Sequence, residues 1–294
     1  MKPGRLLALG LLMAAALLPS ARADDELALR WASQAGPKPT FRGVLNKDGA
    51  GMGAGQMLYP AAGLVGLFAA VMAHAAVNSA AQSAEMRRLQ ANADEVLKPY
   101  SAALDTLSAD DLMAQTRTAL QPQGLAARQG WVNANLELTP VFLMTQDRRA
   151  VMLDVVAQLN DGTGAAPRQL GMRVVSDPRG LPDDKDDWAN ADGQALKKVC
   201  VDLMARAVRH MLDRADAARQ PAAASVERTV RFVEGGSQRM ERSRVLEQRC
   251  GRALLLTLSD TLMSVPLAQA AALEPDCGAP APSTTPSPLA AAAQ

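Results

Sequence analysis

Histidine and cysteine are the side chains on which nucleophilic catalysis and zinc binding most often depend. This chain has two histidines, His74 and His210, and three cysteines. Cys200 and His210 are ten residues apart on one predicted helix, a rise of about 15 Å, which is too far for a hydrogen bond. A Cys250–His210 dyad stays open only if the fold brings the two together. The sequence therefore predicts no catalytic, cofactor-binding or metal-binding residue.

Carboxylates are the second group that could carry a reaction. A glycosidase needs two of them facing one cleft, and Glu137 and Asp260 are the first suspects for a hydrolase. Asp260 interrupts the leucine alternation of the last predicted strand, so we expect it to be buried with a shifted pKa. The acidic run 183–187 has a lysine at its centre and no glutamate in the next twelve residues. It predicts a solvated loop rather than a calcium site.

Arginines are concentrated in the last predicted strands, between residues 228 and 252. Four glutamates are interleaved with the seven arginines. This pattern is consistent with a patch for anionic lipid or glycan, or with cross-strand ion pairing on a solvent-facing sheet. The arginines are Arg228, Arg231, Arg239, Arg242, Arg244, Arg249 and Arg252, and the glutamates are Glu227, Glu234, Glu241 and Glu247.

The cysteines at positions 200, 250 and 277 bear on the redox compartment. In an oxidising compartment, a disulfide between Cys200 and Cys250 is one prediction. The alternative is that both are small buried hydrophobic residues. Cys277 lies in a proline-rich segment, and the odd count leaves one thiol over.

Residues 1–23 predict an export signal. A short basic region precedes an uncharged apolar stretch, and Ala21-Arg22-Ala23 fits the small-x-small cleavage rule, with cleavage determined by Ala21 and Ala23. Removing Lys2, Arg5 and Arg22 with the signal leaves 28 basic residues against 30 acidic ones. A chain with this balance has no electrostatic reason to bind nucleic acid.

A second uncharged stretch covers residues 58–77. Its small residues Ala62, Gly66 and Ala70 recur every four positions, and such a stripe lets helix backbones approach closely in membranes or oligomers. The stretch is long enough to span a bilayer but is only weakly apolar. We interpret it as a buried or membrane-surface helix in preference to a true span, with self-association or membrane contact as its role.

The remaining pattern predicts an α+β fold. Residues 24–57 read as a flexible glycine-rich lead-in, and residues 58–125 as a helical region that includes the apolar Gly/Ala-rich helix. Residues 126–267 predict an antiparallel sheet of about six strands with one long helix packed on it. The strands fall at about 130–175 and 226–265, and the helix at about 190–216. Residues 268–294 predict a disordered Ala/Pro-rich tail.

Together these features predict an exported bacterial protein of the periplasm or cell envelope, non-enzymatic, that associates with itself or with a membrane through 58–77. Two alternatives remain: a secreted hydrolase with a carboxylate-based site, and a lipid- or glycan-binding module that uses the arginine-rich strands. The sequence does not indicate a cofactor or identify a small-molecule ligand.

Overall fold

The computed structural model describes residues 27–45, 80–121, 134–162, 164–179, 188, 193–217 and 226–268. Four of the predicted features lie outside these ranges: the signal with Ala21 and Ala23, the segment 58–77 with Ala62, Gly66 and Ala70, the acidic run 183–187, and the tail from residue 269. Among the helices of the described ranges, none is both long and apolar enough to cross a membrane.

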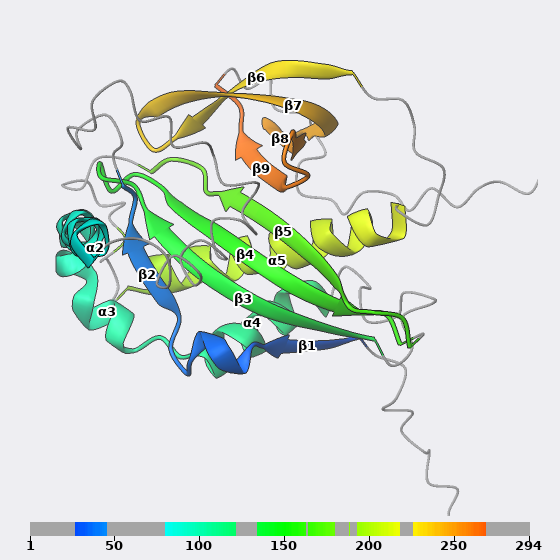
Figure 1. Ribbon diagram of the computed structural model, residues 1–294, viewed down its shortest axis with the longest axis horizontal. Helices are drawn as coiled ribbons and strands as arrows, with labels where there is room; N and C mark the ends of the chain where they lie inside the picture. The colour runs from blue at the N-terminus through cyan, green and yellow to red at the C-terminus, as the bar shows by residue number, and fades with distance from the viewer. Residues whose placement is uncertain are drawn as a thin grey trace, which may run out of the picture.

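The described residues form a mixed α+β fold around one nine-stranded sheet (Figure 1). The strand order is β1-β3-β4-β5-β9-β8-β7-β6, and β2 pairs with β3 beside β1. The strands are β1 (Ala28–Trp31), β2 (Thr40–Gly43), β3 (Asn135–Met144), β4 (Val151–Asn160), β5 (Arg168–Val175), β6 (Glu227–Glu234), β7 (Ser237–Arg249), β8 (Arg252–Thr257) and β9 (Leu262–Pro266). The helical elements are η1 (Ser33–Ala35), α2 (Ala80–Asp94), η3 (Glu95–Tyr100), α3 (Ser101–Asp105), α4 (Ala109–Leu120) and α5 (Gln194–Ala217).

The α+β class is confirmed, but the prediction of a purely antiparallel sheet of about six strands is wrong. Strands β1 and β2 run parallel to β3, and β9 runs parallel to β5. The flexible lead-in predicted over 24–57 is also wrong for residues 27–45, which contain β1 and β2. Both strands have only four residues, too short for a periodicity that sequence alone would reveal.

Pro140 shows how β3 accommodates two partners on one edge. Strand β1 pairs with Asn135–Leu138, and β2 pairs with Val141–Met144. Thr139 and Pro140 lie between these two pairings. Opposite them, the segment that joins β1 to β2 leaves the sheet edge through η1. Because proline has no backbone N–H to donate, this gap is where β3 can contain one without losing a ladder hydrogen bond.

One face of the sheet packs on helices α4 and α5. Alternate residues of β3 and β4 point into this core, including the fully buried Leu136 and Leu153. Helix α5 adds Leu196 and Met204, and α4 adds Leu112. Helix α4 begins after Ser108, whose hydroxyl caps it by accepting a hydrogen bond from the Asp111 backbone N–H at 3.2 Å.

The opposite face of β4 and β5 is covered by strands β6–β9, which curl over it as a second layer (Figure 1). Met152 and Val175 of the first layer contact a smaller core that includes Phe232 and Leu255. The two layers join where β5 meets β9, and this parallel pairing covers only three residue pairs, Met172–Val174 with Leu262–Ser264.

Asp147 in the β3–β4 turn ties the tip of the β6–β7 hairpin to the first layer. Its carboxylate accepts hydrogen bonds from the backbone N–H of Gly236 at 2.5 Å and of Arg149 at 3.0 Å, and from the Thr145 hydroxyl at 2.6 Å. Burial opposes ionisation of Asp147, but these hydrogen bonds outweigh it and hold the pKa of the carboxyl below its usual value.

We expect Asp147→Asn to lower the free energy of unfolding at pH 7 by about 1 kcal/mol, since the site is exposed and solvent screens it. The native pKa lies below the unfolded one, so this stabilisation is present above the unfolded pKa and is lost as pH falls through the native pKa. Urea denaturation at pH 7 and pH 3 measures the loss in the free energy of unfolding and how that loss depends on pH. If Asp147→Asn lowered the free energy of unfolding equally at pH 3, the stabilising role of the ionised Asp147 carboxylate would be contradicted.

Candidate functional site

The β6–β7 hairpin carries most of the predicted arginine-rich region and forms the outer surface of the second layer (Figure 1). Alternation along β6 sends Val230 and Phe232 into the core and leaves Thr229 and Arg231 exposed. On β7, Ser243 is buried. Because side chains alternate along a strand, Met240, Arg242 and Arg244 lie on the other face.

We call this outer face of the hairpin the basic face, defined by Arg231, Met240, Arg242 and Arg244. Met240 lies directly across from Arg231 in the register, and Arg242 follows two residues later on the same side of β7. The Met240 side chain is an unusual surface residue, with 65% of the residue exposed. An exposed apolar side chain thus lies next to Arg231 and Arg242 on this face.

Only part of the arginine set is neutralised by ion pairs. Arg242 lies 3.6 Å from Glu227, and Arg239 lies 3.6 Å from Glu234. These contacts are the cross-strand pairing that the sequence suggested as one alternative. Arg231 and Arg244 make no side-chain hydrogen bond or ion pair with the described residues. The basic face therefore keeps unpaired positive charge.

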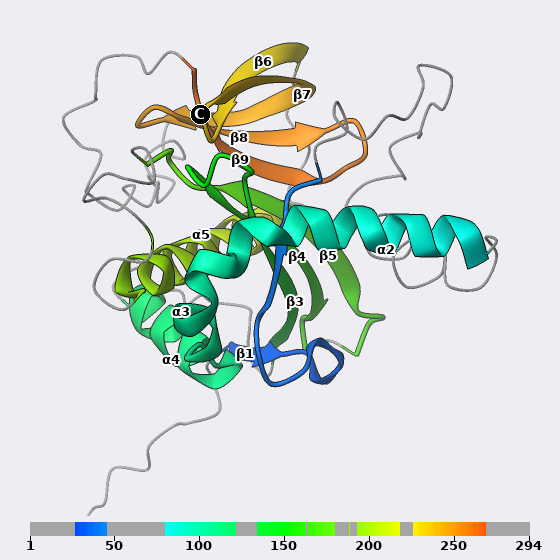
Figure 2. The same cartoon turned by 90° about the vertical axis from the view of Figure 1, so that its left-hand side faces the viewer.

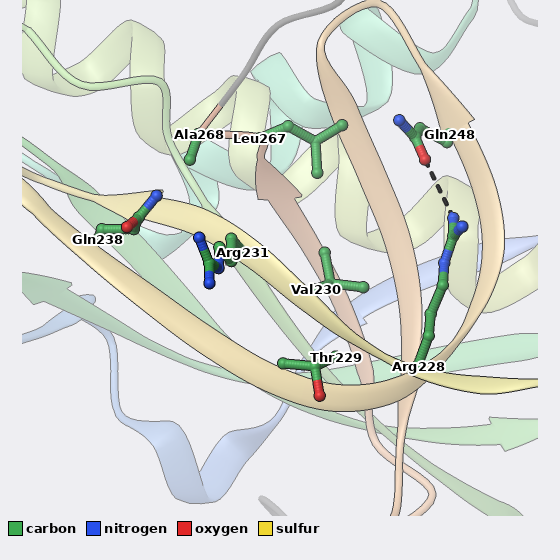
Figure 3. Close-up of a pocket in the computed structure, with 8 residues that line it drawn as sticks. All are labelled: Arg228, Thr229, Val230, Arg231, Gln238, Gln248, Leu267 and Ala268. Atoms are coloured by element: carbon green, nitrogen blue, oxygen red, sulfur yellow. Dashed lines mark hydrogen bonds between the residues drawn. The ribbon is translucent and has the colours of Figure 1, made fainter.

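A hollow of about 260 Å³ opens beside the basic face, between β6, β7 and the chain after β9 (Figure 3). Arg228 and Arg231 line it together with Gln238 and Gln248, and Leu267 and Ala268 form another part of its lining. The Arg228 guanidinium donates a hydrogen bond to the Gln248 side-chain oxygen at 3.1 Å. Among the described residues that line this hollow there is no carboxylate, so its polar groups favour an anionic or neutral ligand over a cation.

Beneath the hairpin lies a buried ion pair that the sequence did not reveal. Asp154 of β4 accepts two hydrogen bonds from Arg173 of β5, at 2.6 and 2.5 Å, and only 3% of the Asp154 side chain is exposed. Burial opposes the charge on Arg173, but the carboxylates of Asp154, Glu234 and Glu241 outweigh it and raise the pKa of the guanidinium. Burial also raises the pKa of Glu241, although Arg173 opposes this.

The two carboxylates suspected of hydrolysis are not brought together. Glu137 lies on β3, and Asp260 lies in the turn between β8 and β9, with strands β4 and β5 between them in the sheet order. The expectation that Asp260 is buried is wrong, because 77% of its side chain is exposed and it pairs with Arg214 at 3.9 Å. Its φ of 58° shows that it interrupts the leucines because it forms a turn.

The predicted Cys200–Cys250 disulfide is wrong. Cys200 is a free thiol on α5, and its burial raises the pKa of the thiol. This agrees with the alternative prediction that Cys200 is a small buried hydrophobic residue. Cys250 is disulfide-bonded, which also removes the Cys250–His210 dyad. Cys250 occupies the β7–β8 turn with a φ of 55°. Cys200 instead lies on α5, in the larger core between the sheet and the helices.

Within the ranges that the structure describes, no group of three or more histidine, cysteine, aspartate or glutamate side chains could hold a metal ion. Comparison with protein-family models, with curated proteins and with solved structures finds no match for this chain. Functional inference therefore depends on the geometry and chemistry of the residues themselves.

Proposed function

We propose that this chain is an exported, non-enzymatic protein of the cell envelope that docks on an anionic lipid surface through the basic face of β6–β7. Export is inferred from residues 1–23 of the sequence. The docking proposal is carried by one observation: the exposed Met240 lies among Arg231, Arg242 and Arg244 on a single sheet face. It does not depend on the segment 58–77.

The distribution of charge supports a defined orientation. Residues 227–249 contain six arginines and four glutamates, a net charge of +2, whereas the chain without residues 1–23 carries −2. The rest of that chain therefore carries −4. An anionic surface would attract the hairpin and repel the remainder, and basic residues near such a surface contribute about 1 kcal/mol each.

The exposed methionine favours lipid over a soluble polyanion as the partner. Guanidinium groups can bind phosphate oxygens through paired hydrogen bonds, while an apolar side chain between them can enter the boundary between headgroups and acyl chains. A soluble polyanion would provide no apolar region for Met240. Val226, directly before β6, is also exposed and adds apolar surface near the same hairpin.

Vesicle sedimentation tests the proposal. We expect the full chain to bind phosphatidylglycerol-containing vesicles more tightly than phosphatidylcholine vesicles, with binding that weakens as salt increases. Arg231→Gln combined with Arg244→Gln should weaken binding by about 2 kcal/mol, or roughly 30-fold.

Arg30→Gln combined with Arg42→Gln is the matched control, because both arginines are exposed and lie on β1 and β2. This control changes the total charge equally but leaves the hairpin intact, so it should bind vesicles almost as the parent chain does. Equal weakening by the two pairs of substitutions would show a nonspecific charge effect and overturn the proposal.

A further inference from the structure

A second group of basic side chains lies between α5 and the start of β8, away from the basic face. On β8, Leu254 and Leu256 point to the α5 side of the sheet, and Ala253 and Leu255 point to the other side. Arg252 has the same parity as Leu254, so its side chain extends toward α5. Arg206 and His210 are four residues apart on α5 and therefore share one face of that helix.

Arg252 is held firmly at the junction of the two sheet layers. Its guanidinium donates hydrogen bonds to the Asp177 carboxylate at 2.6 Å, to the Val175 carbonyl oxygen at 2.5 Å and to the Ser264 carbonyl oxygen at 3.2 Å. Its Nε is buried and has no hydrogen-bond partner in the part of the chain that the structure describes. A buried N–H without a partner is costly, so a missing acceptor is the simplest explanation.

His210 has the same deficiency. Its Nδ1 is buried and finds no hydrogen-bond partner among the described residues. Burial, together with the charges of Arg209, Arg206 and Arg252, lowers the pKa of His210 to about 3, so the ring is neutral at neutral pH. A neutral imidazole carries one N–H donor, and Nδ1 can be that donor.

Arg206 lacks an acidic partner. Its side chain makes no hydrogen bond or ion pair with the described residues, and burial with the nearby charges of Arg252 and Arg209 lowers its pKa to about 10. The two neighbouring carboxylates are already engaged, Asp177 with Arg252 and Asp202 with Lys198 at 2.6 Å. Since an unpaired charge of this kind is unfavourable, the cluster has positive charge and donors in excess.

We propose that an oxyanion of the phosphate class binds between α5 and the start of β8, where it accepts hydrogen bonds from Arg206, from Nδ1 of His210 and from Nε of Arg252. The three donors come from two elements, and the ligand would supply the acceptor that each of them lacks. A guanidinium fork matches the oxygen spacing of a phosphate group. This site is independent of the basic face and of the proposed membrane docking.

The test uses the histidine ring as its reporter. The full chain contains only two histidines, so their imidazole signals in an NMR spectrum are readily assigned by a His210→Gln variant. We expect inorganic phosphate, titrated against chloride at constant ionic strength, to shift the His210 signals saturably. A phosphomonoester such as glycerol 3-phosphate, in a parallel titration, shows whether the site takes the free ion or a phosphate group on a larger ligand.

Arg206→Gln should weaken phosphate binding at least about tenfold, and Arg206→Lys, which keeps the charge but not the fork, should weaken it less. Arg214→Gln is the matched control, because Arg214 lies on the same helix but pairs with Asp260. Absence of a phosphate-dependent shift of His210 in the parent chain overturns the proposal, whether or not the variants fold. Equal weakening by Arg206→Gln and Arg214→Gln also overturns it.

The two proposed sites can fail separately. Arg206→Gln should leave vesicle sedimentation unchanged, and Arg231→Gln with Arg244→Gln should leave the phosphate titration unchanged. Loss of phosphate binding in the hairpin variant would instead place the phosphate contact on the basic face, which would contradict the site between α5 and β8.

Discussion

Arg173→Leu is expected to lower the free energy of unfolding by about 3–5 kcal/mol, because it leaves the carboxylate of Asp154 buried without its partner. The pair is bidentate, with hydrogen bonds of 2.6 and 2.5 Å, and both β-sheet layers close over Asp154. Urea denaturation monitored by far-ultraviolet circular dichroism measures this change.

The double substitution Asp154→Leu with Arg173→Leu separates the cost of a lone charge from the net value of the pair. Replacing a buried ion pair by apolar residues of similar size is often neutral or stabilising, so we expect the double variant to recover most of the loss. The contrary result is a free energy of unfolding of Arg173→Leu within about 1 kcal/mol of that of the parent chain. Asp154 would then have to reach water, and the packing between the layers would be looser than the structure shows.

The second large effect is expected at Gly43, where α2 crosses the end of β2 (Figure 2). A Cβ at this position would collide with the carbonyl group of Ala93, which is backbone and cannot rotate away. The close approach is stabilised by hydrogen bonds from the Gly43 N–H to the Asp94 carboxylate at 2.7 Å and from the Gln90 amide to the Gly43 carbonyl oxygen at 3.1 Å.

We expect Gly43→Ala to lower the free energy of unfolding by about 3 kcal/mol, since the helix must move and the hydrogen bonds around Gly43 must lengthen. Gly164→Ala is the control: a Cβ there meets no atom within 4 Å, although φ is +80°, so only backbone strain of about 1–2 kcal/mol is added. Chemical denaturation of both variants measures the difference. A Gly43→Ala chain no less stable than Gly164→Ala would contradict the steric argument.

The alternating apolar residues of β3, β4 and β5 were readable from the sequence because each of these strands has at least one consistently buried face. Val151, Leu153 and Val155 do point into the core beneath α5. Asp154 lies on the other side of β4 and is nevertheless buried. Strands β6–β9, more than seventy residues later in the chain, cover that side, and a local period contains no information about a distant covering layer.

The candidate sites were predictable to different degrees. The arginine-rich strands were visible because six arginines occur within 23 residues, from 227 to 249. Which arginines are paired was not predictable, since the register determines that Met240 faces Arg231. The group at Arg206 was missed for another reason: Arg252 and Asp177, whose charges act on Arg206, are far from it along the chain.

The sequence by itself determined the α+β class, the long helix α5 and the concentration of arginine near the C-terminal strands. Each of these depends on residues within a few positions of one another, where periodicity and capping act directly. Only the tertiary structure decided which strands run parallel, that Cys200 is free, that Asp260 is an exposed turn residue, and that Arg206, His210 and Arg252 converge. Those outcomes depend on long-range pairing and on curling of the sheet, because burial and charge at a residue are set by whatever the fold places against it.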